Sequence, residues 1–223
     1  MGISLMALST TISAVAQTPP SAAERGGYSG LHQAAVMGDM ARMKEAIARG
    51  AAVDVRDSHG RTPLHVAAYF RRHEVMRVLI DAGADPNAFE NDDYDIVTIA
   101  AVANDPATLR LALALGADPG NVTSPYEGTA LIAAAHLGHT EVVKILIEAG
   151  APLDHVNNLR WTALIESIVL GDGGPAHVET LRALVEAGAD VNLADGNGSS
   201  PLALARARGY TEMVRILEQA GAR

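Results

Sequence analysis

Residues 60–88, GRTPLHVAAYFRRHEVMRVLIDAGADPNA, carry the signals of one complete helical unit. Thr62 and Pro63 form a typical helix start, because a threonine hydroxyl accepts a free first-turn amide and proline lacks an N–H that would be unpaired there. Apolar residues then recur at helical spacing over residues 75–80, and Gly83 follows where a helix C-cap needs a positive φ. The stretch predicts two short helices joined by a turn.

The unit recurs along almost the whole chain. Two markers return independently at intervals of 33 or 34 residues, with a single interval of 38 in each series: the apolar residue of TPLH and the glycine of AGAD. The apolar anchors are Leu31, Leu64, Val97, Leu131, Leu164 and Leu202, and the glycines are Gly50, Gly83, Gly116, Gly150, Gly188 and Gly221. Two markers in phase indicate tandem repeats. We expect repeats at residues 28–56, 57–89, 90–123, 124–156, 157–194 and 195–223, with five extra residues at 172–176.

The repeated pattern, G-x-T-P-L-H-x-A-A followed by G-H-x-E-V-V-x-x-L-I-x-A-G-A-D-x-N, resembles the ankyrin repeat. Residues 60–88 and 128–151 match it best, and the resemblance covers residues 28–223. It implies an all-α solenoid in which each repeat is a β-turn finger followed by two antiparallel helices. The fingers and first helices would line a concave face. For a protein of this family we expect a non-enzymatic module that binds a partner protein.

The residues at three positions inside the repeats indicate structural roles. In the column of His65, only His32 of the first repeat is also a histidine, so a catalytic role cannot depend on this column as a whole. The family resemblance implies that this histidine supports neighbouring loops. Arg206 and Glu218 occupy columns that are small or apolar in the other repeats. The last repeat is therefore expected to cap the solenoid.

Composition excludes several classes of function. The chain has 17 basic and 26 acidic residues, a formal charge of -9, so a nucleic acid is not an expected partner. The absence of cysteine removes disulfides and sulfur-ligated zinc. His73-Glu74 lacks the second histidine of a zinc-protease helix, and the glycines of residues 171–174 lack the lysine of a phosphate loop. We expect no catalytic residue, no bound metal and no cofactor.

The N-terminus predicts export. Residues 3–16 are mostly apolar and end in Ala14-Val15-Ala16, the small-x-small pattern that a signal peptidase accepts, although no basic residue precedes the run. The run is shorter than the roughly 20 residues of a membrane span. We therefore predict a signal peptide over residues 1–16, a disordered leader over 17–27, and a bacterial periplasmic protein. A cytoplasmic location is the alternative if the run is not a signal.

Most aromatic residues lie where a member of this family contacts its partners. Five of the eight fall on fingers and two at the end of a first helix. Rings on exposed fingers are typical binding anchors, although several could instead pack against adjacent fingers. The predicted partner-binding residues are Tyr69, Phe70, Phe89, Asp92, Asp93, Tyr94, Tyr126 and Trp161.

The finger at residues 90–95, ENDDYD, places four carboxylates in six residues. It would steer the chain, expected to be a monomer, toward a partner with a basic patch. The alternative is a metal- or small-ligand-responsive accessory protein that uses Glu90 to Asp95. The glycine and the terminal glutamate of a calcium loop are missing from this finger.

Overall fold

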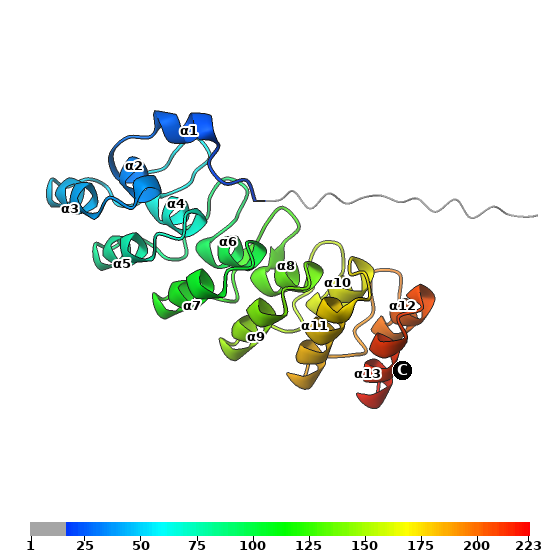
Figure 1. Ribbon diagram of the computed structural model, residues 1–223. Helices are drawn as coiled ribbons and strands as arrows, with labels where there is room; N and C mark the ends of the chain where they lie inside the picture. The colour runs from blue at the N-terminus through cyan, green and yellow to red at the C-terminus, as the bar shows by residue number, and fades with distance from the viewer. Residues whose placement is uncertain (1–16) are drawn as a thin grey trace, which may run out of the picture.

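The computed structural model describes residues 17–223 and consists of antiparallel helix pairs. The first helices of the pairs are α2 (Gly30–Met37), α4 (Pro63–Tyr69), α6 (Ile96–Val102), α8 (Ala130–His136), α10 (Ala163–Val169) and α12 (Pro201–Arg208). The second helices are α3 (Met40–Ala48), α5 (His73–Asp81), α7 (Pro106–Ala114), α9 (Thr140–Glu148), α11 (Pro175–Glu186) and α13 (Thr211–Gln219). Figure 1 shows them stacked in two rows along the molecule. The predicted all-α solenoid is confirmed.

Capping residues set the helix boundaries. The side chains of Thr62, Asp95, Thr129, Thr162 and Ser200 each accept a hydrogen bond from the backbone N–H three residues later. Ser29, the equivalent residue of the first repeat, makes no such bond. All six AG glycines have φ between 83° and 96°, where a side chain would be strained. The sequence signals for helix starts and stops therefore act as expected in nearly every repeat.

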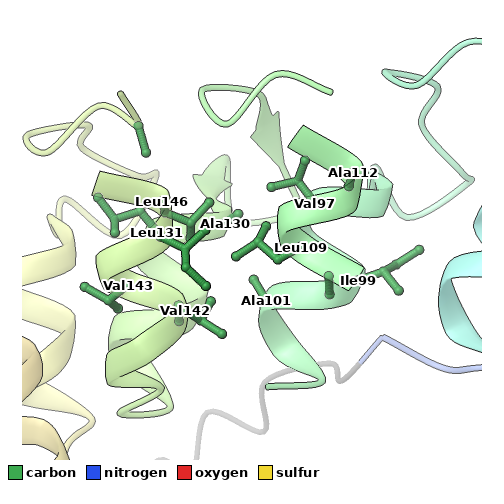
Figure 2. Close-up of a cluster of buried hydrophobic side chains, with 14 of the residues drawn as sticks. Val97, Ile99, Ala101, Leu109, Ala112, Ala130, Leu131, Val142, Val143 and Leu146 are labelled. Carbon is green, nitrogen blue, oxygen red and sulfur yellow. The ribbon is translucent and has the colours of Figure 1, made fainter. Parts of the chain in front are cut away.

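The core is a continuous layer of small and branched apolar side chains between consecutive helix pairs. Figure 2 shows it between α6 and α7 on one side and α8 and α9 on the other. Leu109, Leu131 and Leu146 are fully buried in this layer, and Ala101 and Ala112 let the helices approach closely. Each repeat thus buries its faces on its neighbours, as a solenoid requires.

The fingers are joined to one another through their backbones. The amide of Asn91 donates to the carbonyl of His59 at 2.9 Å, Ser124 donates to Asp93 at 3.1 Å, and Asn158 donates to the Tyr126 carbonyl at 3.0 Å. The fourth finger also contains the two-residue strands β1 (Val122–Thr123) and β2 (Gly128–Thr129), which pair antiparallel. These bonds hold consecutive fingers at fixed positions relative to one another.

The prediction of a disordered leader over residues 17–27 is wrong. Helix α1 (Ala22–Gly27) lies there, and it begins with a capping box in which Ser21 and Glu24 each accept the other's backbone N–H. The buried Arg61 side chain contacts Glu24 and donates to the Thr18 carbonyl at 3.3 Å, which attaches the leader to the second finger. The predicted signal peptide, residues 1–16, lies outside the described residues. No helix in the described part of the chain has the length and apolar character to cross a membrane.

The five extra residues of the fifth repeat lengthen its second helix. Helix α11 has 12 residues, whereas its neighbours α9 and α13 have 9. Asp172 accepts hydrogen bonds from the Gly174 amide and the His177 ring, both at 2.8 Å, and Tyr210 donates to the Gly171 carbonyl at 2.9 Å. The His177 ring also contacts the His136 carbonyl of the fourth repeat at 2.9 Å, so the insertion is tied to the repeats on both sides of it.

Candidate binding groove

A hollow of about 140 Å³ lies on the finger side of the stack, against α6, α8 and α10. We call it the Glu166 pocket. Its walls are mostly apolar, and its polar side chains include a carboxylate, an imidazole and two amides. The wall residues used below are Tyr94, Tyr126, Leu137, Leu159 and Leu170, and the polar residues are Gln17, His136, Asn157 and Glu166. A second hollow of about 180 Å³ lies beside Tyr69, Arg71 and Asp105, and Gln17 borders both.

Glu166 is a carboxylate inside the stack. It is 4% exposed, it accepts a hydrogen bond from Asn157 Nδ2 to its Oε1 at 3.0 Å, and its Oε2 lies 3.6 Å from His136 Nδ1. Burial raises the pKa of Glu166 to about 7, against the Asn157 hydrogen bond, which lowers it. Burial, followed by the charge of His177, lowers the pKa of His136. Neither group is therefore held fully charged at neutral pH.

Glu166 is not among the residues predicted from the sequence, although the repeat alignment contains a signal for it. Its column holds Gln33, Val66, Ile99, Ala133 and Leu204 in the other repeats. Val66 and Ile99 are buried in the core, so a carboxylate in this column departs from the apolar pattern. Such a departure at a buried position is a candidate functional residue, because a buried charge needs a compensating partner.

The structure brings three of the predicted aromatic residues to the hollows. Tyr94 and Tyr126 line the Glu166 pocket, and Tyr69 lines the second hollow. The expectation that Tyr94 is exposed or half-exposed is wrong, because this ring is only 6% exposed. Its column also contains the buried Arg61 and Gly128, whereas Trp161 in the same column is half-buried.

The remaining predicted aromatic residues, Phe70, Phe89 and Trp161, are half-buried and border neither hollow. The guanidinium of Arg25, in α1, lies 5.6 Å from the centre of the Phe70 ring, a cation–π contact. The leader thus covers part of the surface that the sequence assigned to a partner.

The acidic finger does not gather its four carboxylates around one point. Glu90 is buried and accepts the backbone N–H groups of Asp92 and Tyr94 at 3.0 and 3.1 Å. Asp95 is fully buried and accepts the Thr98 amide at 2.8 Å as the cap of α6. Of the four carboxylates, only those of Asp92 and Asp93 are exposed to solvent. The finger therefore offers charge to a partner but does not arrange its four carboxylates as a set of metal ligands.

A second cluster of acidic residues is already paired with an arginine side chain. Within residues 17–223, the group of carboxylate and imidazole ligand atoms close enough to share an ion consists of Glu24, Asp57 and His59, all within 4.8 Å of one another. The Arg61 guanidinium contacts Glu24 and donates to Asp57 at 2.8 Å. Burial would raise the pKa of Asp57, but hydrogen bonds from Tyr28 and Arg61 hold it at about 2. This cluster is an internal ion-pair network.

His65 has the structural role that the repeat pattern predicts. Its Nδ1 lies 2.8 Å from Thr62 Oγ1, and its Nε2 lies 3.2 Å from the Tyr94 carbonyl on the next finger. Burial lowers the pKa of His65 to about 4, so the ring is neutral at physiological pH. His32 contacts the Arg61 carbonyl in the same way at 2.8 Å. Both histidines join consecutive repeats.

Comparison with known families confirms what the helix pairs and fingers indicate. The profile described as "Ankyrin repeats (3 copies)" matches residues 10–90 and 97–195, and that described as "Ankyrin repeats (many copies)" matches residues 175–218. The chain belongs to the ankyrin repeat family. Proteins of this family generally mediate protein–protein interactions, and the fold is typically a non-enzymatic scaffold.

Individual relatives are similar to this ankyrin repeat protein in sequence or structure over most of its length. The ankyrin repeat protein YahD of Escherichia coli is 34% identical over 190 residues, 85% of this chain and 94% of YahD. An ankyrin repeat domain of Acinetobacter baumannii is 42% identical with a TM-score of 0.81, covering 86% of this chain and 98% of that one. The ankyrin repeat domain of Bcl-3, a member of the IkappaB protein family, is 30% identical with a TM-score of 0.77, covering 88% of each.

Proposed function

We propose that this ankyrin repeat protein binds a partner protein through its finger and first-helix side, and that the Glu166 pocket is the centre of the contact. The observation that supports this is a largely apolar hollow beside two tyrosines, on the side where the fingers are fixed by backbone hydrogen bonds. Leu137 and Val122, at 39% and 47% exposure, add apolar surface nearby. A pre-formed apolar hollow with few polar groups is the usual character of a binding site.

The charge of the molecule indicates the kind of partner. Its formal charge is -9, and the tip of the third finger exposes Asp92 and Asp93. Exposed carboxylates beside a contact surface accelerate association with a basic partner more than they strengthen the final complex. We therefore propose a partner with a basic patch, bound by one copy of this chain.

Site-specific photo-crosslinking tests the location of the contact. With p-benzoylphenylalanine in place of Leu137, ultraviolet light should join the protein to its partner in its native compartment, and mass spectrometry of the product identifies that partner. The matched control carries the same group in place of Lys144, which is exposed on the second helix α9. Equal or stronger crosslinking from position 144 would move the interface to the second helices.

The captured partner then permits a quantitative test. Tyr126→Ala should weaken binding by about 2 kcal/mol or more, as desolvated aromatic anchors usually do. Asp92→Lys combined with Asp93→Asn should mainly slow association and reduce its salt dependence. Asparagine is chosen at position 93 because this residue has φ of 59°, which asparagine tolerates. Unchanged binding kinetics in both variants, measured by surface plasmon resonance, would contradict the assignment.

We also propose that the protein is exported to a bacterial periplasm. Support comes from the apolar run at residues 3–16 and its Ala14-Val15-Ala16 ending. Cleavage at this site would leave Gln17 as the first residue.

A further inference from the structure

Glu166 is a buried carboxylate without a lysine or arginine beside it among the residues that the structure describes. The described residues that line its pocket include no lysine and no arginine, and His136 is the single basic group among them. Asn157 satisfies one oxygen, while the other faces His136 at 3.6 Å, too far for a hydrogen bond. A buried carboxylate loses its hydration, so it favours any cation that can enter the pocket.

The pocket has the size and lining for the end of a basic side chain. Its volume is about 140 Å³, and an engineered apolar cavity of about 150 Å³ in another protein admits benzene. Tyr94 and Tyr126 provide aromatic walls, and Leu159 and Leu170 provide aliphatic ones. A guanidinium stacks on aromatic rings and pairs with carboxylates through a planar set of donors, and its three-carbon stem packs on apolar walls.

Gln17 shows that the pocket already accepts a planar N–H donor. This residue is 9% exposed and borders the pocket, and its side-chain Nε2 is buried without a hydrogen-bond partner within the described part of the chain. An unpaired buried donor costs about 1–3 kcal/mol, so a group that can both enter the pocket and pair with its carboxylate would displace Gln17.

We propose that the Glu166 pocket binds an arginine side chain of the partner, with the guanidinium paired to the Glu166 carboxylate between Tyr94 and Tyr126. This inference names the chemistry of the contact at the centre of the proposed interface, and it rests on that function. The arginine inserts from the open side of the stack and takes the place of the Gln17 amide.

The test uses a small probe, so it does not require the partner to be known. Acetyl-arginine methylamide is titrated into the full-length ¹⁵N-labelled protein, and acetyl-citrulline methylamide serves as the matched neutral probe of nearly the same shape. The arginine probe should shift amide resonances of pocket residues such as Tyr126, Leu137 and Glu166. It should bind at least about tenfold more tightly than the citrulline probe, a factor equal to one charge-assisted interaction.

Two variants separate the buried carboxylate from general surface charge. Glu166→Gln keeps the shape and the Asn157 contact, and it should lower the affinity for the arginine probe at least about tenfold. Glu127→Gln removes the same charge from an exposed residue on the adjacent finger, and it should change the affinity less than about twofold. Equal binding of the two probes, or equal losses in the two variants, would overturn the proposal.

The affinity for the arginine probe should also rise between pH 6 and pH 8. The groups that face Glu166 are His136 on α8, itself close to His177 on α11, and Tyr94 and Tyr126 on the fingers. Raising the pH ionises Glu166 and keeps His136 neutral, and both changes favour a cation. An affinity that is flat or falls over this range would contradict the assignment. Probe binding that fails while Leu137 still crosslinks the partner would overturn the arginine pocket and leave the proposed interface standing.

Discussion

At the scale of single residues, Glu166 couples the stability of the fold to pH. Its pKa rises from 4.5 to about 7 on folding because burial penalises the charged form. The stabilising contribution is complete below pH 4.5 and is lost as the pH rises through 7, because the folded state retains a proton that the unfolded state has released. Glu166 therefore weakens the fold at neutral pH, a cost that is consistent with a role in binding.

Glu166→Gln removes this titration without changing the shape of the side chain. The free energy of unfolding of the variant should match that of the unmodified protein at pH 4 and exceed it by roughly 1–3 kcal/mol at pH 8, since each unit of pKa shift corresponds to about 1.4 kcal/mol. Urea unfolding followed by the fluorescence of Trp161, the single tryptophan, measures the difference. Glu127→Gln is the control, and a gain that does not grow with pH would refute the burial argument.

At the scale of elements, α1 depends on one arginine of another repeat. Arg61 has a side chain that is 3% exposed, and it contacts both Glu24 of α1 and Asp57 of the second finger. Tyr28, just after α1, donates to Asp57 at 2.6 Å. The leader is therefore held in part by an ion network around the buried Arg61 side chain.

Arg61→Ala should leave Asp57 buried without its cation and cost roughly 3–5 kcal/mol of unfolding free energy. Hydrogen exchange measured by mass spectrometry should accelerate over residues 22–27 far more than over α9. Arg42→Ala, which removes an exposed partner of Asp39, should cost less than about 1 kcal/mol. Unchanged exchange in α1 after Arg61→Ala would show that other contacts hold the leader.

At this scale, the elements that local sequence signals predict can be separated from those that depend on distant contacts. Helix starts, second helices and C-cap glycines were predictable because each follows from residues within a few positions of one another, as at Thr62, Asp105 and Gly83. Helix α1 was not predicted because its attachment depends on Arg61, which lies 37 residues after Glu24. The S-x-x-E capping box at residues 21–24 is nevertheless present in the sequence. The burial of Tyr94 was missed because it depends on the neighbouring fingers.

At the scale of the whole molecule, the repeat period fixes the architecture but not the binding site. The site became visible only where the stack brought residues of three repeats together, as it does for Tyr94, His136 and Glu166. The sequence could have indicated Glu166 as a carboxylate in an apolar column, but its pairing with Asn157 and His136 depends on the fold.

The proposed export and the Glu166 pocket are linked at this scale. Gln17, the residue expected to begin the mature chain, borders this pocket. N-terminal sequencing of the protein isolated from its native compartment should read Gln17 as the first residue, since cleavage follows the second small residue of Ala14-Val15-Ala16. A cytoplasmic protein that retains Met1 or Gly2 would contradict export, but it would not affect the assignment of the fold or of the Glu166 pocket.

The ion pair on the last repeat has a consequence for how copies of the protein meet. Arg206 and Glu218 pair at 2.6 Å with side chains 59% and 48% exposed, at columns that are buried and half-buried, respectively, in the other repeats. A second molecule stacking end to end on α12 and α13 would have to dehydrate both charges, and a pair removed from water does not recover that cost. End-to-end stacking of a second molecule on α12 and α13 is therefore opposed.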